Sequence, residues 1–373
     1  MDAFTTPSNW QKVRLGDIGK PCMCKRVMKH QTTRYGEIPF YKIGTFGNTA
    51  DAFISKKLFL EYKTKYSFPK KGDILISASG TIGRAVIYDG KPAYFQDSNI
   101  VWIDNDETLV KNDFLFYAYS NIKWNTEHTT ILRLYNDNFR NTLIPLPPLN
   151  EQIAIANILS DVDHYLYSLD ALILKKESVK KALSFELLSQ RKRLKGFNQA
   201  WQKVRLGDIA NYLTSNLSVE QITQQGKIKV YDVNNFIGYT DTTFISDKPY
   251  ISIVKDGSVG RVRILPPKTN ILSTMGALIA NHKTTTEFLF YLLSNFDFKN
   301  FISGSIIPHI YFKDYKEKTI SLPPLNEQIA IANILSGLDN EIISLKNKKR
   351  QFENIKKALN HDLMSAKIRV LNK

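Results

Sequence analysis

Fifteen residues occur twice in this chain, letter for letter. The sequence LPPLNEQIAIANILS runs from Leu146 to Ser160 and returns from Leu322 to Ser336, so the copies lie 322 − 146 = 176 positions apart. An identity of this length does not arise by chance, and the chain therefore contains two versions of one unit. Each copy opens with a proline pair, then an asparagine at the expected N-cap and a glutamate in the first turn. Each unit is thus expected to end in a long helix that starts here.

A second repeat opens each unit. WQKVRLGDI spans Trp10–Ile18 and Trp201–Ile209, an offset of 201 − 10 = 191, while GTIGR at Gly80–Arg84 matches GSVGR at Gly257–Arg261 at 257 − 80 = 177. The second unit is therefore shorter by 191 − 176 = 15 residues, and most of the shortening precedes the GxxGR turn. Between the repeats the sequences have diverged, which indicates a shared scaffold with different surfaces.

Each diverged part is expected to form a mixed α/β globule. Short strand-like runs such as Gly72–Ser77 and Asn99–Ile103 alternate with Gly, Asp and Pro turn residues. An aromatic-rich helix is predicted over Asp113–Asn121 in the first unit and over Thr286–Asn295 in the second.

The long helices carry apolar residues at alternating steps of three and four, which is typical of a coiled coil. The first is predicted to run from Asn150 to Lys195, which is about 69 Å at about 1.5 Å per residue. Because a globule separates the two helices, we expect them to pair antiparallel. The predicted fold is therefore α+β, with two similar mixed α/β domains joined by an antiparallel helix pair in an internal pseudo-twofold repeat. The predicted boundaries are 1–145 and 201–320 for the globules, and 146–200 and 321–373 for the helical segments.

The chain is strongly basic. Its 373 residues include 51 Lys and Arg against 35 Asp and Glu, a formal charge of +16, and the pI is near 9.5. Such an excess indicates a nucleic acid or an anionic membrane surface as partner. Two cysteines, Cys22 and Cys24, are too few for a disulfide framework, and no apolar stretch approaches the length of a membrane span. We expect a cytoplasmic protein.

Two motifs contain residue types that are found in ligand sites. The GxxGR loops lack the GxxxxGK[ST] and GxGxxG patterns, so a tight turn between strands is favoured over a phosphate loop, with Arg84 and Arg261 as possible DNA contacts. Cys22, Cys24 and the nearby His30 do not form a zinc set of four ligands, and the second unit has no counterpart cysteines. No metal site is predicted.

The segments before the proline pairs, from Thr130 to Arg140 and from Ser305 to Lys316, mix basic, amide and aromatic side chains. Such side chains grip phosphates and recognise base edges, although an ordinary loop surface with buried tyrosines explains the pattern equally well. The candidate DNA contacts are Lys42, Arg84, Arg133, Asn136, Asn138, Arg140, Arg261, His309, Tyr311 and Lys313.

No catalytic motif was found, which leaves three hypotheses. The first is a non-catalytic DNA-recognition subunit. The second is a coiled-coil scaffold that joins two protein-binding modules, for which we expect no salt-dependent DNA affinity. The third, an enzyme with an unrecognised site, is disfavoured because no His, Asp, Glu or Cys constellation recurs in both units.

Taken together, the motifs resemble those of specificity subunits of type I restriction–modification systems. In that family W-x-x-x-x-L-G-[DE] opens each target recognition domain, as at Trp10–Asp17 and Trp201–Asp208; a G-x-x-G turn follows, and P-L-P-P-L-x-E-Q-x-x-I starts each conserved helix, as at Pro145–Ile155. The second copy departs from this pattern only in Ser321, which stands where the first has Pro145.

The resemblance implies a subunit without its own active site or cofactor. Each recognition domain is expected to bind one half of a split, asymmetric target in double-stranded DNA, and the helices to fix the gap. Two modification subunits are expected to dock on the helices, and restriction subunits to join them; S-adenosylmethionine, ATP and Mg would then sit on those partners. The candidate spacer and subunit-contact residues are Leu149, Glu151, Gln152, Leu159, Val162, Leu166, Leu169, Leu325, Glu327, Gln328, Leu335, Leu338, Ile342 and Leu345.

Overall fold

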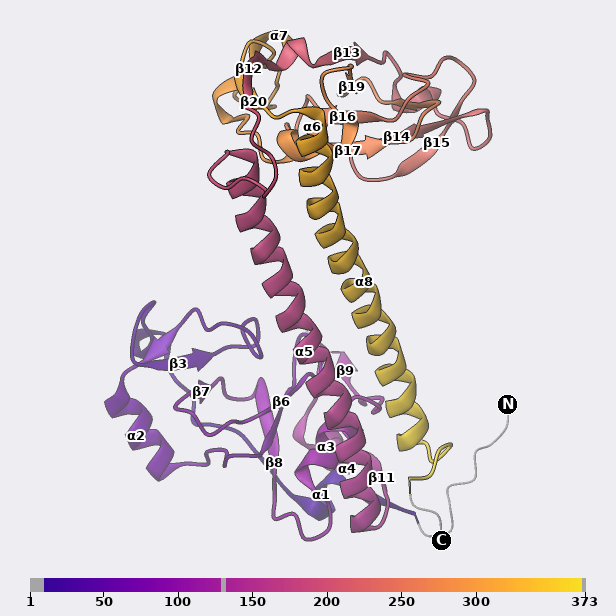
Figure 1. The fold of residues 1–373 in the computed structure, drawn as a ribbon. Helices are drawn as coiled ribbons and strands as arrows, with labels where there is room; N and C mark the ends of the chain where they lie inside the picture. The colour runs from indigo at the N-terminus through magenta and orange to yellow at the C-terminus, as the bar shows by residue number, and fades with distance from the viewer. Residues whose placement is uncertain (1–9, 129–131, 371–373) are drawn as a thin grey trace. The chain divides into compact units, whose positions relative to one another are not determined.

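The computed structural model, drawn in Figure 1, describes residues 10–128 and 132–370. Thr130 and Ile131 of the predicted contact segment lie outside the described residues, as do the first nine and last three residues of the predicted domains. The chain divides into two compact units, unit 1 with residues 1–169 and 348–373 and unit 2 with residues 170–347. These units differ from the four predicted segments because each contains part of both long helices.

Unit 1 contains a four-stranded antiparallel sheet in the order β2-β8-β5-β6 and a three-stranded sheet in the order β4-β3-β7. Two antiparallel pairs, β1-β11 and β9-β10, complete it. The strands are β1 (Gln11–Arg14), β2 (Gly19–Cys22), β3 (Ile38–Tyr41), β4 (Phe53–Ile54), β5 (Ile74–Ser77), β6 (Ala85–Ile87), β7 (Tyr94–Phe95), β8 (Ile100–Asn105), β9 (Glu127–His128), β10 (Leu132–Arg133) and β11 (Leu143–Leu146). The short helices are α1 (Leu15–Ile18), α2 (Lys56–Lys65), α3 (Asn112–Tyr119) and α4 (Asn136–Asn141).

Unit 2 contains a four-stranded sheet in the order β13-β19-β16-β17, a three-stranded sheet in the order β15-β14-β18 and the pair β12-β20. The strands are β12 (Gln202–Arg205), β13 (Ala210–Thr214), β14 (Ile228–Tyr231), β15 (Phe236–Thr240), β16 (Tyr250–Val254), β17 (Val262–Leu265), β18 (Thr269–Ile271), β19 (Met275–Ala280) and β20 (Thr319–Leu322). The short helices are α6 (Thr286–Ser294) and α7 (Phe312–Tyr315).

Every sheet of unit 2 has a counterpart of the same strand order in unit 1. Even the register agrees, since Gln11 faces Leu146 in β1-β11 and Gln202 faces Leu322 in β12-β20. The one parallel pairing also recurs, as β3-β7 and β14-β18. The predicted internal repeat is therefore confirmed in the topology.

The main insertion in unit 1 is helix α2. Ile38 pairs with Ile54 and Ile228 with Thr240, so the offset falls from 228 − 38 = 190 to 240 − 54 = 186 across the loop between those strands. It then falls by nine more, to 177 at the GxxGR turn, across the segment that forms α2 in unit 1. Ser55 caps α2 by accepting a hydrogen bond from the backbone N–H of Leu58 at 3.2 Å. The predicted shortening is thus mostly the absence of one capped surface helix.

Helices α5 (Leu149–Leu188) and α8 (Leu325–Met364) are 40 residues each, about 60 Å of helix at about 1.5 Å per residue. Both begin one residue before the asparagine predicted as N-cap. The first ends seven residues before the predicted Lys195, because Gln190 adopts the left-handed conformation (φ 62°) that closes a helix C-terminus. Ala366 does the same after α8 (φ 56°).

The two helices pair antiparallel within each unit, as predicted. In unit 2, Lys176 pairs with Glu341 at 2.7 Å and Lys180 pairs with Asp339. In unit 1, the Tyr165 and Phe352 rings lie 4.6 Å apart. Partner numbers fall on α8 as they rise on α5, which defines the antiparallel register.

The core of each unit is closed by the start of one long helix and the end of the other. Ile155 and Leu159 of α5 share the main core of unit 1 with Leu363 and Met364 of α8. In unit 2, α8 contributes Ile331, Ala332 and Leu335, and α5 contributes Leu187. Burying one such leucine stabilises a fold by about 2 kcal/mol. Within the described residues, no helix combines the length and apolarity needed to cross a membrane.

Candidate nucleic-acid interface

The opening tryptophan of unit 1 is joined to both long helices through one buried carboxylate. The indole N–H of Trp10 donates to Glu151 Oε2 at 3.0 Å. The guanidinium of Arg369, which follows α8, donates to both oxygens of Glu151 at 2.7 and 3.0 Å. Glu151 is 2% exposed, so these donors compensate a charge that would otherwise be costly to bury.

Unit 2 repeats this arrangement. Trp201 donates to Glu327 at 2.9 Å, and Arg193 donates to both carboxylate oxygens at 3.2 and 2.7 Å. Glu327 is fully buried. In each unit the tryptophan belongs to the opening motif and the glutamate to the motif that starts the long helix, so their contact explains why the two motifs occur together.

The LGD part of the opening motif forms a tight turn against the segment before the proline pair. A Cβ atom at Gly16 would lie 3.2 Å from the Cβ and carbonyl oxygen of Arg140, and one at Gly207 would lie 3.2 Å from the Cβ of Lys316. The motif therefore needs glycine for a close approach.

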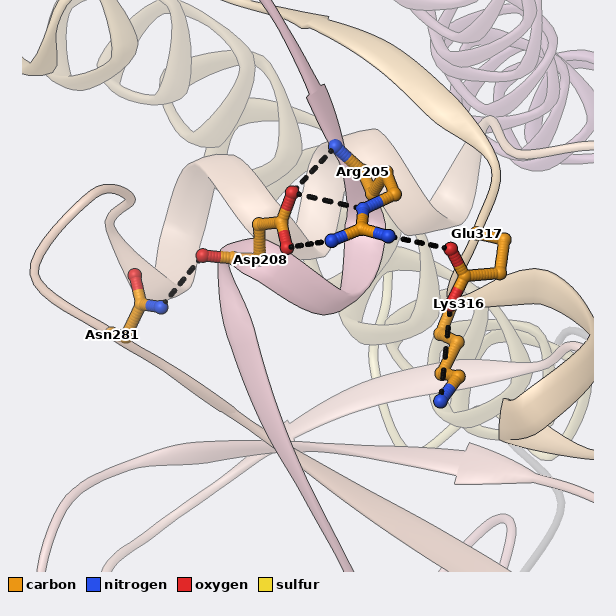
Figure 2. A network of polar contacts seen from close by, with 5 residues as sticks. All are labelled: Arg205, Asp208, Asn281, Lys316 and Glu317. Carbon is orange, nitrogen blue, oxygen red and sulfur yellow. Dashed lines mark hydrogen bonds and ion pairs between the residues drawn. The ribbon is translucent and has the colours of Figure 1, made fainter.

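Figure 2 shows the aspartate of this turn in unit 2. Asp208 accepts hydrogen bonds from the backbone N–H of Arg205 at 3.2 Å and from its guanidinium at 3.3 Å, which holds the pKa of that carboxyl below its ordinary value. Arg205 also donates to Glu317 at 3.0 Å, and Lys316 lies 3.8 Å from Glu317. Asn281 donates to the Asp208 carbonyl at 2.9 Å. The network fixes the turn at the end of β12.

The glutamine that follows the buried glutamate joins each long helix to its aromatic-rich helix. Gln152 accepts a hydrogen bond from the Lys111 N–H at 2.8 Å and donates to the carbonyls of Leu109 and Pro147 at 3.1 and 2.9 Å. Gln328 makes the corresponding contacts in unit 2.

These contacts change the role predicted for several helix residues. Buried side chains bonded inside their own unit offer no surface to another subunit, so Glu151, Gln152, Glu327 and Gln328 are internal connectors rather than subunit contacts. Leu159, Leu169, Leu335 and Ile342 are likewise buried within the chain, as are, in part, Val162, Leu166, Leu338 and Leu345. Only Leu149 and Leu325 of the predicted set are exposed, at 41% and 45%.

A tyrosine of each aromatic-rich helix is tied to the helix pair. The Tyr117 hydroxyl donates to Asp163 at 2.8 Å, Lys356 pairs with the same carboxylate, and its Nζ lies 5.6 Å from the centre of the Tyr117 ring. Burial, together with Asp163, raises the pKa of the Tyr117 phenol. The same arrangement recurs in unit 2 with Tyr291, Asp339 and Lys180.

The GxxGR motifs are turns between strands, linking β5 to β6 and β16 to β17. All four glycines have positive φ. A Cβ atom at Gly83 would lie 2.0 Å from the indole nitrogen of Trp124, and one at Gly260 would lie 2.7 Å from an aromatic ring. Conformation and packing both require glycine here.

The arginine of each turn reaches the loop between the third and fourth strands of its unit. Arg84 donates to the Gly47 carbonyl at 3.4 Å and lies 3.5 Å from Asn48 Oδ1. Arg261 donates to Asn234 Oδ1 at 2.8 Å. Both arginines remain exposed, so the turn presents an arginine whose direction is set by a neighbouring loop.

In unit 1 the segment before the proline pair runs beside the GxxGR turn. The Leu134 N–H donates to the Ala78 carbonyl at 2.9 Å, and Arg133 pairs with Ser79 in an isolated bridge. The Arg133 guanidinium donates to the Ser98 carbonyl at 2.8 Å. The fold thus brings two candidate contacts, Arg84 and Arg133, to strand ends that meet at one turn.

In unit 2 a histidine takes the place of Arg133. His309 forms the bridge with Asp256, and its Nδ1 lies 2.6 Å from Asp256 Oδ1. The His309 and Tyr311 rings are stacked with their centres 6.4 Å apart, and the Lys313 Nζ lies 5.4 Å from the Tyr311 ring. The same place beside the same turn therefore offers different chemistry in the two units.

Comparison with known proteins agrees with this architecture. The model of the type I restriction modification DNA specificity domain matches residues 7–176 and 198–354. The chain belongs to this family.

Individual relatives of this specificity-domain chain cover different lengths. A putative type I restriction enzyme specificity subunit from Haemophilus influenzae is 64% identical over 148 residues, 39% of this chain and 38% of that protein. A type I restriction enzyme specificity subunit from Methanocaldococcus jannaschii is 26% identical over all of this chain and 96% of its own. The crystal structure of a type I restriction–modification S subunit from M. genitalium matches with a TM-score of 0.64 at 20% identity, over 97% of this chain and 98% of that one, which shows the fold.

The specificity-domain fold separates the remaining candidates. Asn136 and Arg140 of α4 line a hollow with Lys20, next to the LGD turn. Asn138 lines a different hollow with His361 of α8. These three residues therefore do not gather with Arg84 and Arg133.

Lys42 joins Arg133 in a hollow of about 540 Å³ that Arg26 and Lys29 also line. The last two were missed in the sequence, although Lys25–Arg34 is rich in basic residues and lacks acidic ones. Cys24 is buried in the core of unit 1, where burial raises the pKa of its thiol to about 12 and so disfavours the thiolate that binds zinc.

Proposed function

We propose that this chain recognises a two-part sequence in duplex DNA, with unit 1 contacting one half and unit 2 the other, as a specificity subunit without an active site of its own. The observation that carries the proposal is the difference at one equivalent place. Beside the shared GxxGR turn, unit 1 presents Arg133 and unit 2 presents His309. A common scaffold with different contact side chains suits an asymmetric target.

The positive charge supports duplex DNA as the ligand. An excess of +16 supplies sequence-independent attraction to phosphates, and that attraction weakens steeply as salt rises. Base contacts from the turns and neighbouring segments then provide discrimination between sequences.

The long helices provide a surface for two equivalent partners. Four pairs of exposed apolar residues have members that are 176 positions apart in the sequence. One member of each pair lies in each unit, so each unit carries a set of four. The pairs are Leu149 and Leu325, Ile153 and Ile329, Tyr167 and Ile343, and Val179 and Ile355. We propose that each set docks one modification subunit, that these partners hold S-adenosylmethionine, and that restriction subunits with ATP and Mg join the same cytoplasmic assembly.

The helices also suit a spacer. Each is continuous over 40 residues, and each contributes to both units. We propose that their common length sets the unspecified gap between the two half-sites.

The test is to map methylated adenines in the genome of a host cell that expresses this chain together with its modification subunits. The expected result is methylated adenines within one split, asymmetric sequence. Arg133→Ala should relax one half only, and His309→Ala the other half only. Methylation of no split sequence by the purified complex would contradict the proposal. A DNA affinity that does not change between two salt concentrations would instead favour a protein-binding scaffold.

A further inference from the structure

One loop keeps the same backbone in both units and differs in charge. It connects β2 to β3 in unit 1 and β13 to β14 in unit 2. The Met28 N–H donates to Gln31 Oε1 at 2.8 Å, as the Ser218 N–H does to Gln221 Oε1 at 2.9 Å. From Met28 and Ser218 onward the two loops are therefore equivalent at an offset of 190. In the preceding strands Cys22 pairs with Trp102 where Leu213 pairs with Ala277, an offset of 191, so unit 1 has one extra residue between Cys22 and Met28.

The two loops differ in formal charge. Residues 23–35 include four Lys and Arg and no acidic residue, a formal +4, whereas residues 213–225 include one glutamate and no Lys or Arg, a formal −1. Three basic side chains of unit 1 have direct counterparts, in the pairs Lys29 and Val219, His30 and Glu220, and Arg34 and Gln224. Lys25 and Arg26 lie in the longer stretch before Met28, where unit 2 has the uncharged residues Ser215 and Asn216.

In unit 1 the loop opens onto candidate DNA contacts. Arg26 and Lys29 line the hollow of about 540 Å³ with Lys42 and Arg133, so four cations surround it. Its one carboxylate, Asp97, is paired with Arg26 at 2.8 Å, and Arg26 stays 69% exposed. Just outside, Lys42 pairs with Asp51 at 2.8 Å.

In unit 2 the equivalent loop and the end of β13 line an uncharged hollow at a different place, since Asp232 and His309, the counterparts of Lys42 and Arg133, are not among its lining residues. Ser215, Asn216 and Gln221 lie there with Asn270 and hydroxyl and apolar side chains, and the lining contains no Lys, Arg, Asp or Glu. Amides and hydroxyls recognise DNA without neutralising phosphates.

We infer that the loop of residues 23–35 is a DNA-contacting, specificity-determining element of unit 1 that acts through its Lys and Arg side chains, and that the loop of residues 213–225 contacts DNA without charge. This inference rests on the proposed function. The two units then hold duplex DNA with unequal electrostatic contributions, and unit 1 supplies more of the salt-dependent affinity.

The test replaces the Lys and Arg side chains of the unit 1 loop with uncharged residues of the unit 2 loop. A loop variant of the full chain carries Lys25→Ser, Arg26→Asn, Lys29→Val and Arg34→Gln, which replaces each cation with an uncharged residue of the unit 2 loop. A charge-matched control removes four exposed lysines elsewhere in unit 1, through Lys56→Gln, Lys57→Gln, Lys65→Gln and Lys71→Gln. Binding to a mixed-sequence duplex of about four helical turns, at about 34 Å each, is measured against salt.

The loop variant should bind with a shallower dependence of log K on log salt, since each lost phosphate contact removes about 0.9 from the slope. The control should keep the slope of the unaltered chain. Equal slopes for the two variants would overturn the inference and leave the proposed function standing. If the unaltered chain shows no salt-dependent affinity at all, both fall.

A second readout uses the complex with its modification subunits. The loop variant should alter the methylated sequence in one half of the target and leave the other half unchanged. An unchanged target in both halves would overturn the assignment of specificity to this loop.

Discussion

At the residue scale, the repeated motifs are explained by contacts within each unit, between its opening motif and the motif that starts its long helix. Trp10 and Trp201 are needed because Glu151 and Glu327 are buried and require donors. Sequence alone identified the motifs but assigned the glutamates to the spacer and subunit-contact set, because the helix start is identical in both copies. Their real partners, Arg369 and Arg193, lie 218 and 134 positions away, and no local pattern points to them.

Removing one buried carboxylate should therefore be costly. Glu327→Ala leaves the indole N–H of Trp201 without its acceptor, and we expect a loss of about 2 kcal/mol in the free energy of unfolding, the cost of an unsatisfied buried donor. Urea denaturation of the full chain provides the measurement. Asp247→Ala, which removes an exposed carboxylate of the same unit, should leave the midpoint unchanged. Equal midpoints for both variants would show that Glu327 is not a connector.

Alkaline pH should destabilise unit 2 partly through Tyr250. Burial raises the pKa of this phenol to about 12, whereas tyrosine in an unfolded chain ionises near pH 10, at about its reference value. The folded unit holds the neutral form, so the stability gained is intact below the unfolded pKa and is lost as pH rises through the folded pKa. Tyr250→Phe should lose less stability than the unaltered chain across that window, as followed by urea midpoints. Identical pH profiles would contradict this expectation.

At the element scale, periodicity predicted the long helices and their antiparallel pairing but not their ends. The first helix stops at Leu188 because Gln190 turns left-handed, and nothing in its side chain announces that conformation as a glycine would. Local backbone conformation also separates the candidate DNA contacts into different places in unit 1. Arg133 and Arg140 are seven positions apart, yet Arg140 belongs to α4, which turns it toward the LGD turn.

The exposed apolar residues of the helices give a stoichiometric prediction. Ile153→Asp alone should leave a complex with one modification subunit, because the equivalent set in unit 2 is intact. Ile153→Asp with Ile329→Asp should leave none, since a charge at each apolar contact opposes docking. Light scattering of the purified complex reports the mass. Leu60→Asp with Ile302→Asp, the same kind of change at exposed apolar positions outside the long helices, should retain both partners, and loss of both partners from the single variant would contradict two independent docking sets.

At the scale of the whole molecule, the repeat alone predicted two units of one topology. It did not predict that α5 begins in unit 1 and ends in unit 2, or that α8 begins in unit 2 and ends in unit 1. That exchange depends on the antiparallel register, which is set by pairs such as Lys180 with Asp339 and Asp163 with Lys356. Such pairs lie more than 150 positions apart and can be recognised only once the helices are placed.

A matched insertion in both helices should lengthen the target. Seven residues added after Asp170 in α5 and seven before Lys348 in α8 preserve the heptad pattern and the pairing within each unit. The addition is about 10 Å of helix, and the gap should grow by about three base pairs at about 3.4 Å each. Methylation-sensitive sequencing measures the gap, and an unchanged gap would show that the helices are not the spacer. The same insertion in α5 alone breaks the pairing and should shift or abolish recognition.

The exchange of helix ends also fixes the order in which the chain is completed during translation. Unit 2 is one continuous stretch, residues 170–347, whereas unit 1 begins at the first residue and closes only with residues 348–373. Glu151 therefore emerges 218 residues before Arg369, a delay of about 10 to 40 s at about 5 to 20 residues per second. The first unit to be synthesised is the last to be finished, so a chain that stops between Asn347 and Arg369 leaves unit 1 incomplete and unit 2 whole.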